Sequence, residues 1–249
     1  MSEHVRIERS GAVQIIRIAR PEKKNALTRA MYAAMAEALR AGDADEGVRV
    51  HVILGQPGAF SAGNDMQDFM AAAMGGTMGN EVLDFLGALS TAKKPVVSGV
   101  DGLAIGIGTT IHLHCDLTFA TPQSLFRTPF VDLGLVPEAA SSLLAPRVMG
   151  YQKAFALLAL GEGFSAEAAM EAGIVHRIVE PEELEPAVLE AAQAIAARPP
   201  QAMQITKALL RAPDETVSAR IAREAKHFAE RLTSHEAREA VTAFLTKKK

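Results

Sequence analysis

Glu138 is a carboxylate with only apolar residues directly around it, in the largely apolar segment 126–142, whose sequence is FRTPFVDLGLVPEAASS. Leu135 and Val136 lie just before it, a proline separates them from the acid, and two alanines follow. Such neighbours withdraw a carboxyl group from water, which raises its pKa and makes it a better base near neutral pH. A structural explanation exists as well, because a proline–glutamate pair suits the first turn of a helix and its dipole. Glu138 is therefore either a catalytic base or a helix-start residue, whereas Asp132, the nearest other acid, is expected at the surface or in a cap.

Two glycine-containing segments could present backbone N–H groups to a substrate. They are FSAGND (residues 60–65) and AIGIGTT (residues 104–110), and each places small residues where a strand leads into a helix. Glycine adopts backbone conformations that other residues avoid, and the first N–H groups of a helix have no partner within it. Two such turns could converge on one oxygen atom as an oxyanion hole, although close packing and capping would explain the same glycines. A phosphate-binding loop is excluded, because no lysine follows GIGTT, and the dinucleotide fingerprint is not met.

Other chemically interesting side chains favour structural interpretations. His112 and His114 are two residues apart, so a helix would point them in different directions and they make a poor metal pair. Cys115 lies in an apolar context and is expected to be a core thiol. Ser141 and Ser142 have no base nearby in the sequence and are expected to be packing residues. We therefore expect no metal site.

Composition excludes several classes of protein. The chain has 249 residues and a net charge of −3 with scattered basic residues, so nothing favours nucleic-acid binding. The single cysteine excludes an internal disulfide and is consistent with a reducing compartment. No apolar run approaches the roughly 20 residues of a membrane span. We expect a cytoplasmic protein, or an organellar one that has lost its presequence.

Alternating strand and helix patterns up to about residue 150 predict an α/β core. A strand–turn–strand is expected over 4–20, and Thr28 is expected to cap a helix that reaches about Arg40. Further strands are expected within 48–55, 94–102, 116–121 and 124–130, with a turn-rich crossover over 56–65 and a glycine-led helix over 103–115. The remainder reads as helical except for 174–179, with a capped helix between Ser165 and Gly173, a break at 198–200 and an amphipathic helix over the last forty residues.

Four ordered segments, RPEKKNALT, AFSAGNDM, KPVVSGVDGLAIGIGTTIHLHCDLTFA and FRTPFVDLGLVPE, resemble the crotonase (enoyl-CoA hydratase/isomerase) superfamily. The resemblance covers nearly the whole chain and implies an α/β fold, a crotonase-like spiral of ββα units with a C-terminal helical trimerisation region. We expect residues 1–195 to form the spiral core and residues 196–249 a helical oligomerisation or cap region. The resemblance also implies an acyl-CoA substrate, a homotrimer or dimer of trimers, and no cofactor, since CoA enters as part of the thioester.

The resemblance further implies roles for individual residues. The backbone N–H groups of Asn64 and Ile107 would hold the thioester oxygen. The two glutamates of the family's hydratases would fall on Thr110 and Phe130, neither of which is an acid, so the ordinary hydratase mechanism is in doubt. The implied substrate- and CoA-binding residues are Lys23, Lys24, Ala26, Ala62, Asp65, Met66, Thr110, Phe130, Leu135, Phe244 and Lys247.

The stretch TPFVDLGLVPEAASS resembles the Δ3,Δ2-enoyl-CoA isomerase branch, especially its peroxisomal type, in which one glutamate follows a proline at the position of Glu138. This resemblance implies that a single base takes a proton from C2 and returns it at C4. Two alternatives stay open: another crotonase reaction, such as enoyl-CoA hydration or ring-enoyl isomerisation, and a non-catalytic acyl-CoA-binding or scaffold protein.

Overall fold

The computed structural model describes residues 2–75 and 79–246, and within these ranges ten strands form two mixed sheets. The larger sheet has the order β1-β2-β3-β5-β7-β10, and the smaller has the order β4-β6-β8-β9. Pairing is antiparallel between β1 and β2 and between β8 and β9, and parallel elsewhere. The strands are β1 Val5–Ser10, β2 Val13–Ile18, β3 Val50–Leu54, β4 Ala59–Ser61, β5 Val96–Val100, β6 Leu103–Ile105, β7 Leu117–Ala120, β8 Leu125–Arg127, β9 Phe164–Ser165 and β10 Arg177–Ile178.

After the first hairpin the chain alternates between the two sheets. β3, β5 and β7 join the larger sheet, and each is followed directly by a strand of the smaller sheet, β4, β6 and β8. Each turn of this spiral is therefore two strands and a helical connection. Because β4, β6 and β8 pair side by side, the turns that follow them are stacked next to one another.

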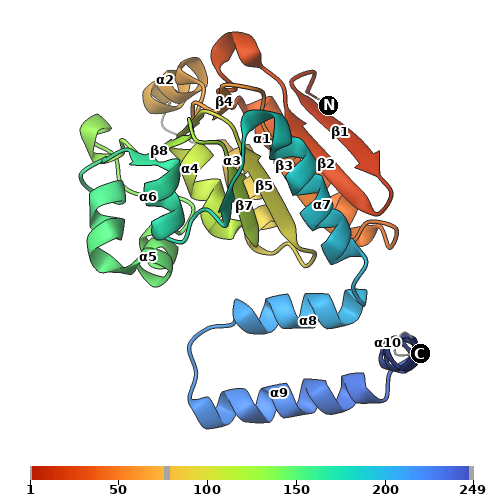
Figure 1. The fold of residues 1–249 in the computed structure, drawn as a ribbon. Helices are drawn as coiled ribbons and strands as arrows, with labels where there is room; N and C mark the ends of the chain where they lie inside the picture. Colours follow the sequence, from red (N-terminus) through yellow and green to blue (C-terminus); the bar gives the residue numbers. More distant parts are fainter. Residues whose placement is uncertain (1, 76–78, 247–249) are drawn as a thin grey trace.

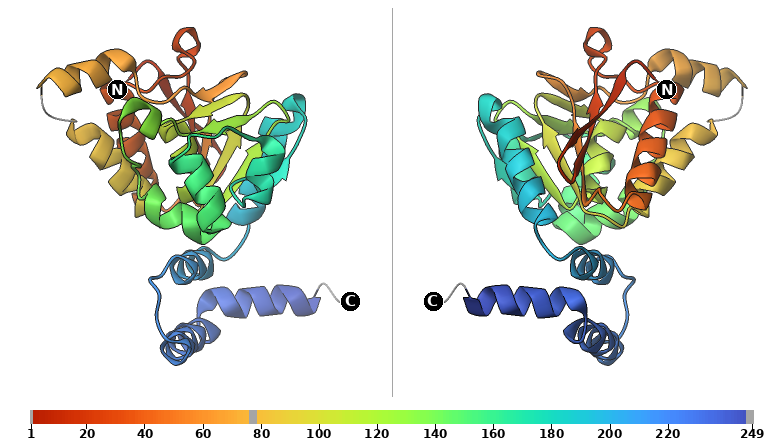
Figure 2. Two further views of the ribbon diagram at one scale, coloured as in Figure 1. Left: turned by 90° about the vertical axis from the view of Figure 1, so that its left-hand side faces the viewer. Right: turned by 90° about the vertical axis from the view of Figure 1, so that its right-hand side faces the viewer.

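Helices cover both faces of the larger sheet (Figures 1 and 2). α1 packs on α3 over one face, where Ile16 and Ile53 join the main core, and α7 covers the other face over Val52 and Val97. The α-helices are α1 Arg29–Ala44, α2 Met66–Gly75, α3 Asn80–Ser90, α4 Ile107–Thr110, α5 Ser141–Leu158, α6 Ala166–Glu171, α7 Leu184–Ala196, α8 Pro200–Leu210, α9 Val217–Leu232 and α10 His235–Thr246, and 3-10 turns span Pro21–Lys23, Ile111–His114, Val131–Leu133 and Pro181–Glu183.

The last three helices extend away from the sheets as a separate arm (Figure 1). α8 is tied to the core by charge: Lys207 and Arg211 both lie within ion-pair distance of Asp116, at 2.8 and 3.0 Å. α9 and α10 present exposed large apolar side chains, including Ile221, Phe228 and Leu245. The boundary that we expect at residue 195 falls in the last turn of α7 and stays a prediction.

Most of the expected elements are confirmed, and four details are wrong. The stretch between residues 138 and 173, expected to be helical, contains the short strand β9. Residues 103–105 form the central strand of the smaller sheet, and the helix begins only at Ile107, because Gly106 breaks the chain direction with φ 58° and ψ −120°. The crossover over 56–65 contains β4, a strand too short to show an alternating pattern. Residues 217–246, where one amphipathic helix is expected, form two helices, α9 and α10.

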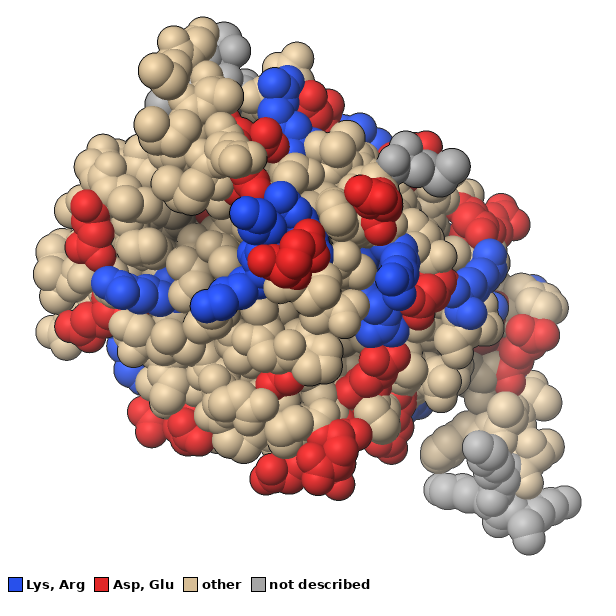
Figure 3. Space-filling view, turned by 90° about the horizontal axis from the view of Figure 1, so that it is seen from above, with Lys and Arg blue, Asp and Glu red and all other residues tan. Residues whose placement is uncertain are grey.

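The surface carries charges of both signs. Basic and acidic side chains are interspersed on the face of the molecule seen in Figure 3. Among the residues that the structure describes, no helix combines the length and the apolar character needed to cross a membrane.

Candidate active site

The two glycine-led turns lie next to each other because their strands are paired. Ser61 in β4 pairs with Ala104 in β6, and Asn64 and Ile107 each follow their paired residue by three positions. The register includes one extra residue in β4, since Ala59 pairs with Leu103 and Ser61 with the next residue of β6. This irregularity is a β-bulge, and it brings the two turns level with each other.

Both turns have backbone conformations that favour glycine. Gly63 has φ 95°, and a Cβ atom there would lie 3.0 Å from the carbonyl oxygen of Ile105. Gly106 has φ 58°. The amides that follow, of Asn64 and Ile107, donate to no acceptor in the described part of the chain. The backbone therefore leaves two neighbouring N–H groups available to a ligand.

A cavity of about 240 Å³ opens at these turns. Asn64 and Ile107 line it together with apolar side chains, among them Phe130 and Leu135. A second, smaller and mainly apolar cavity of about 40 Å³ lies between α1, α2 and α3, and Asn64 and Phe69 line both. A polar group held by the two amides would therefore have apolar space on either side.

The half-buried carboxylate of Glu138 lies against α4, the helix whose first residue, Ile107, lines this cavity. Thr110 Oγ1 donates a hydrogen bond of 2.5 Å to Glu138 Oε1, and Thr110 is fully buried one helical turn after Ile107. Burial raises the pKa of Glu138, and the hydrogen bond from Thr110 opposes that rise only in part. The direction agrees with the sequence-based expectation, but Val136 is 79% exposed, so it does not supply the burial.

Glu138 does not cap the following helix. α5 begins at Ser141 after Ala140, and no side chain caps its N-terminus. The backbone carbonyl of Glu138 accepts hydrogen bonds from the N–H and hydroxyl of Ser141, at 2.9 and 2.6 Å. The helix-start interpretation therefore fails for the carboxylate, and Ser141 is a hydrogen-bonding partner of the segment that carries it.

Tyr32 is a site residue that the sequence analysis missed. Its hydroxyl donates a 2.5 Å hydrogen bond to Asn64 Oδ1, and its ring is buried in α1. Burial and, second, the negative charge of Glu138 raise the pKa of Tyr32 well above its usual range. Tyr32 therefore lies close enough to feel the carboxylate while it holds the side chain of Asn64. A tyrosine among the apolar residues of a helix gives no sequence signal for this contact.

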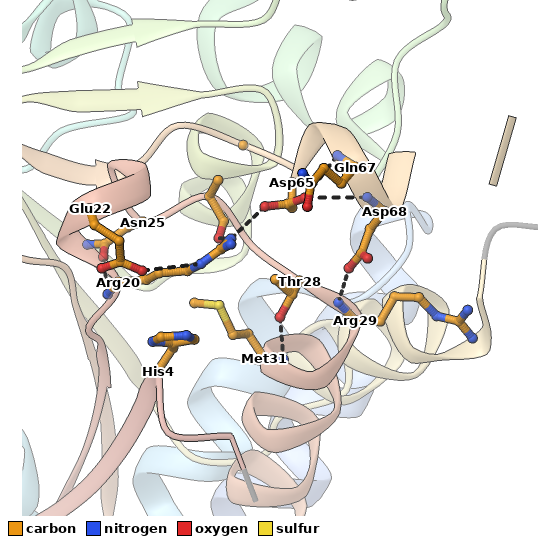
Figure 4. Close-up of polar contacts among 12 residues, drawn as sticks. His4, Arg20, Glu22, Asn25, Thr28, Arg29, Met31, Asp65, Gln67 and Asp68 are labelled. Carbon is orange, nitrogen blue, oxygen red and sulfur yellow. Dashed lines mark hydrogen bonds and ion pairs between the residues drawn. The ribbon is translucent and has the colours of Figure 1, made fainter. Parts of the chain in front are cut away.

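The loop after β2 is joined to the first glycine turn, FSAGND, by a largely buried ion pair (Figure 4). Arg20 Nη1 lies 2.6 Å from Asp65 Oδ2 and also donates to the Ala26 carbonyl. The other carboxylate oxygen of Asp65 accepts from the first amides of α2, so Asp65 is a helix cap whose pKa is lowered chiefly by Arg20. Arg20 was also missed, because its partner is 45 residues away.

The remaining residues implied for CoA binding lie either at or beside the cavity or in the C-terminal part of the chain, away from it. Ala62 lies at the cavity and donates its N–H to the Lys24 carbonyl, while the side chains of Lys23 and Lys24 are exposed beside it. Met66 lines the same cavity and is 59% exposed at the start of α2. Phe244 lies in α10, on the arm and away from α2 and α4 within one chain (Figure 1), and Lys247 lies outside the described residues.

The alternative chemical groups are engaged elsewhere. His112 is buried between Phe60 and Phe126, and burial lowers its pKa to about 3. Burial raises the pKa of Cys115 to about 12, which disfavours a reactive thiolate. Asp132 is exposed and paired with an arginine at 3.0 Å. No cluster of three or more potential metal ligands occurs among the residues described.

Comparison with known proteins places this geometry in a family. The family model described as enoyl-CoA hydratase/isomerase matches residues 8–249. The chain is 31% identical to a probable enoyl-CoA hydratase of Rhizobium meliloti (strain 1021), over 99% of this chain and 96% of that protein. It is 32% identical to enoyl-CoA delta isomerase 2 of Rattus norvegicus, over 99% of this chain but 64% of the longer rat protein.

Solved structures agree with the sequence matches. A Magnetospirillum magneticum AMB-1 protein, provisionally described as an enoyl-CoA hydratase/carnithine racemase, is 44% identical with a TM-score of 0.94, over 99% of this chain and 97% of that one. Pseudomonas aeruginosa OdaA is 40% identical with a TM-score of 0.81, over 98% of this chain and 99% of that one. The expected α/β crotonase fold with C-terminal helices is confirmed. The relatives include both hydratases and isomerases, so they leave the branch open.

Proposed function

The chain belongs to the crotonase (enoyl-CoA hydratase/isomerase) family, and from this premise we propose that it isomerises 3-enoyl-CoA to 2-trans-enoyl-CoA. An acyl-CoA substrate follows from the family. The choice of reaction rests on one observation: at the two positions where a hydratase would carry glutamates there are Thr110 and Phe130, and the hydroxyl of Thr110 is bonded to Glu138. One acid, and not two, is available to the thioester.

The reaction requires a proton to leave C2 and another to arrive at C4. In our proposal the N–H groups of Asn64 and Ile107 hold the thioester oxygen and stabilise the negative charge that develops on it. Glu138, ionised, removes the C2 proton, and the electrons move through the former 3,4 double bond. The protonated Glu138 then returns the proton to C4, so that acid and substrate are both restored.

The surroundings of Glu138 suit one base that is used twice. Burial raises its pKa, which brings the carboxyl closer to the pH at which it can both accept and release a proton. The hydrogen bond from Thr110 fixes the oxygen Oε1 and leaves Oε2 for the proton transfer. Hydration would need a second group to position water, and the buried, apolar Phe130 offers none.

The test is to offer the purified protein 3-enoyl-CoA and 2-enoyl-CoA separately and to analyse the products. We expect a double-bond shift from the first, and deuterium placed at C2 of the substrate should be recovered at C4 of the product, because one base carries the same proton between the two carbons. Glu138→Gln should lower kcat by about 10² to 10⁴-fold while binding of the CoA thioester survives. Asp132→Asn is the matched control, because Asp132 is exposed and should leave kcat unchanged.

Two results would overturn the proposal. Rapid hydration of 2-enoyl-CoA without any double-bond shift would assign the chain to the hydratases. Tight binding of acyl-CoA without turnover of any enoyl-CoA would favour a non-catalytic binding protein.

A further inference from the structure

We propose that His114 is a positioning residue for Glu138 and acts through the backbone of the segment that carries the carboxylate. This inference rests on the proposed role of Glu138 as the base. His114 Nε2 lies 2.8 Å from the carbonyl oxygen of Ala139, the residue that directly follows the acid. A carbonyl oxygen only accepts, so Nε2 carries the proton and the ring donates to the backbone.

The backbone after Glu138 has a conformation that needs such support. Ala139 and Ala140 both have φ 53°, in the left-handed region where a Cβ atom is unfavourable. Two consecutive alanines of this kind persist only where surrounding contacts hold them. Ala140 is exposed, whereas Ala139 is buried and receives the hydrogen bond from His114.

The carbonyl groups of Glu138 and of the next residue each accept a hydrogen bond from a different residue. Ser141 binds the carbonyl of Glu138, and His114 binds the next carbonyl, that of Ala139. These two contacts determine the direction in which the Glu138 side chain leaves the backbone, and hence its alignment with Thr110. Loss of the second contact would release the strained segment without touching the carboxylate itself.

The backbone of His114 is itself held by a hydrogen bond from the arm. Arg211, the C-cap residue of α8, donates to the carbonyl of His114 and also pairs with Asp116. Burial lowers the pKa of His114, with Arg211 as a further cause, which favours the neutral ring. Both the neutral and the protonated ring carry hydrogen on Nε2, so this contact is structural support and not a pH switch.

The experiment compares two substitutions of one residue. His114→Gln keeps an N–H donor near the position of Nε2, whereas His114→Met removes the donor and keeps an apolar side chain of similar reach. We expect His114→Met to lower kcat at least tenfold with KM changed less than threefold, and His114→Gln to restore most of kcat. Thermal unfolding of both variants separates this effect from a general loss of stability.

A second readout follows Glu138 without any substrate. The carboxyl stretch of Glu138, assigned by infrared difference against Glu138→Gln, gives the pKa of that group. We expect this pKa to fall toward the ordinary range in His114→Met, because the released carboxyl becomes more hydrated, and to stay raised in His114→Gln. If His114→Met does not fold, His114→Gln and the double variant His114→Met/Ala139→Gly decide the question: both should keep the raised pKa, because glutamine retains the donor and glycine adopts φ 53° without the strain that the donor offsets.

The outcomes distinguish this inference from the proposed function. A wild-type protein that fails to isomerise refutes the function, while the infrared titration still tests His114. The inference is overturned if His114→Met retains wild-type kcat and an unchanged Glu138 pKa, or if glutamine and methionine impair kcat equally at equal stability.

Discussion

Replacing Thr110 by valine should move the pH dependence of the reaction in a direction fixed by one hydrogen bond. Valine has nearly the shape of threonine but no hydroxyl, so the change removes the 2.5 Å contact to Glu138. A contact of this length between a hydroxyl and a carboxylate is charge-assisted and stabilises the ionised acid. Without it the ionised form is less favourable, and the pKa of Glu138, already raised by burial, rises further.

The size of the effect follows from the strength of such contacts. Hydrogen bonds to charged groups contribute about 1.5 to 3 kcal/mol to stability. Since about 1.4 kcal/mol corresponds to one pH unit, the acidic limb of the kcat/KM profile should move up by about 1 to 2 pH units. Above the new pKa the base is ionised again, so the rate should recover toward the wild-type value.

The assay is the initial rate of double-bond isomerisation measured across pH for the wild type, Thr110→Val and Thr110→Ser. Serine keeps the hydroxyl and serves as the control, with an acidic limb close to that of the wild type. An acidic limb that is unchanged in Thr110→Val, or that moves to lower pH, would refute the assignment of Glu138 as the titrating base.

Three further changes test the site through stability and rate. Because the pKa of Glu138 is higher in the folded than in the unfolded protein, the wild type is most stable in acid and loses stability as pH rises through the pKa of the folded state. Glu138→Gln has no such carboxyl, so it should be more stable than the wild type above that pKa. Urea unfolding at about pH 4 and about pH 8 measures this difference. Tyr32→Phe removes the hydroxyl that holds the Asn64 side chain and should lower kcat by up to about tenfold, as measured by steady-state kinetics. Asp65→Asn removes the closer of two carboxylate partners of Arg20, at 2.6 Å, while Glu22 remains at 3.6 Å, and should cost about 1.5 to 3 kcal/mol of unfolding free energy in urea. The lowered pKa of Asp65 means that its contribution is present above the ordinary aspartate pKa and is lost as pH falls through the lowered value.

Matched controls exist for these changes. Tyr151 is 72% exposed, so Tyr151→Phe should leave kcat unchanged. Asp45 forms an ion pair with exposed Arg9, and Asp45→Asn should lower stability much less than Asp65→Asn, because solvent screens an exposed pair. The reasoning would be contradicted if Tyr32→Phe and Tyr151→Phe lowered kcat equally, or if Asp65→Asn and Asp45→Asn lowered stability equally. A Glu138→Gln protein no more stable than the wild type at the higher pH would also contradict it.

The elements of the core could be predicted because their signals are local. Alternating β-branched runs marked the strands of the larger sheet, and Thr28 and Ser165 were recognised as caps because such caps depend on residues within one turn. β4 and β6 were missed or misassigned because each has three residues, and their pairing partners come from other turns of the spiral. A three-residue strand exists through those partners and has no periodicity of its own.

The site was predictable only as far as its backbone turns and its single acid. Gly63 and Gly106 stood out because few other residues tolerate such turns, and Glu138 stood out because it lacked charged neighbours. The contacts of Tyr32, Arg20 and His114 join segments that are 25 to 45 residues apart, and nothing local marks them. The resemblance to the family supplied the roles, but it carried no information on which side chains hold the base.

The extra residue in β4 determines more than the shape of one strand. Phe60 is fully buried, and without this bulge the turn after β4 would lie one position out of step with the turn after β6. The distance between the two amides is therefore set by the spacing of paired strands and not by any side chain. A hole made of backbone can stay constant while the acids around it are exchanged, which explains how one scaffold can serve reactions that differ only in where the proton goes.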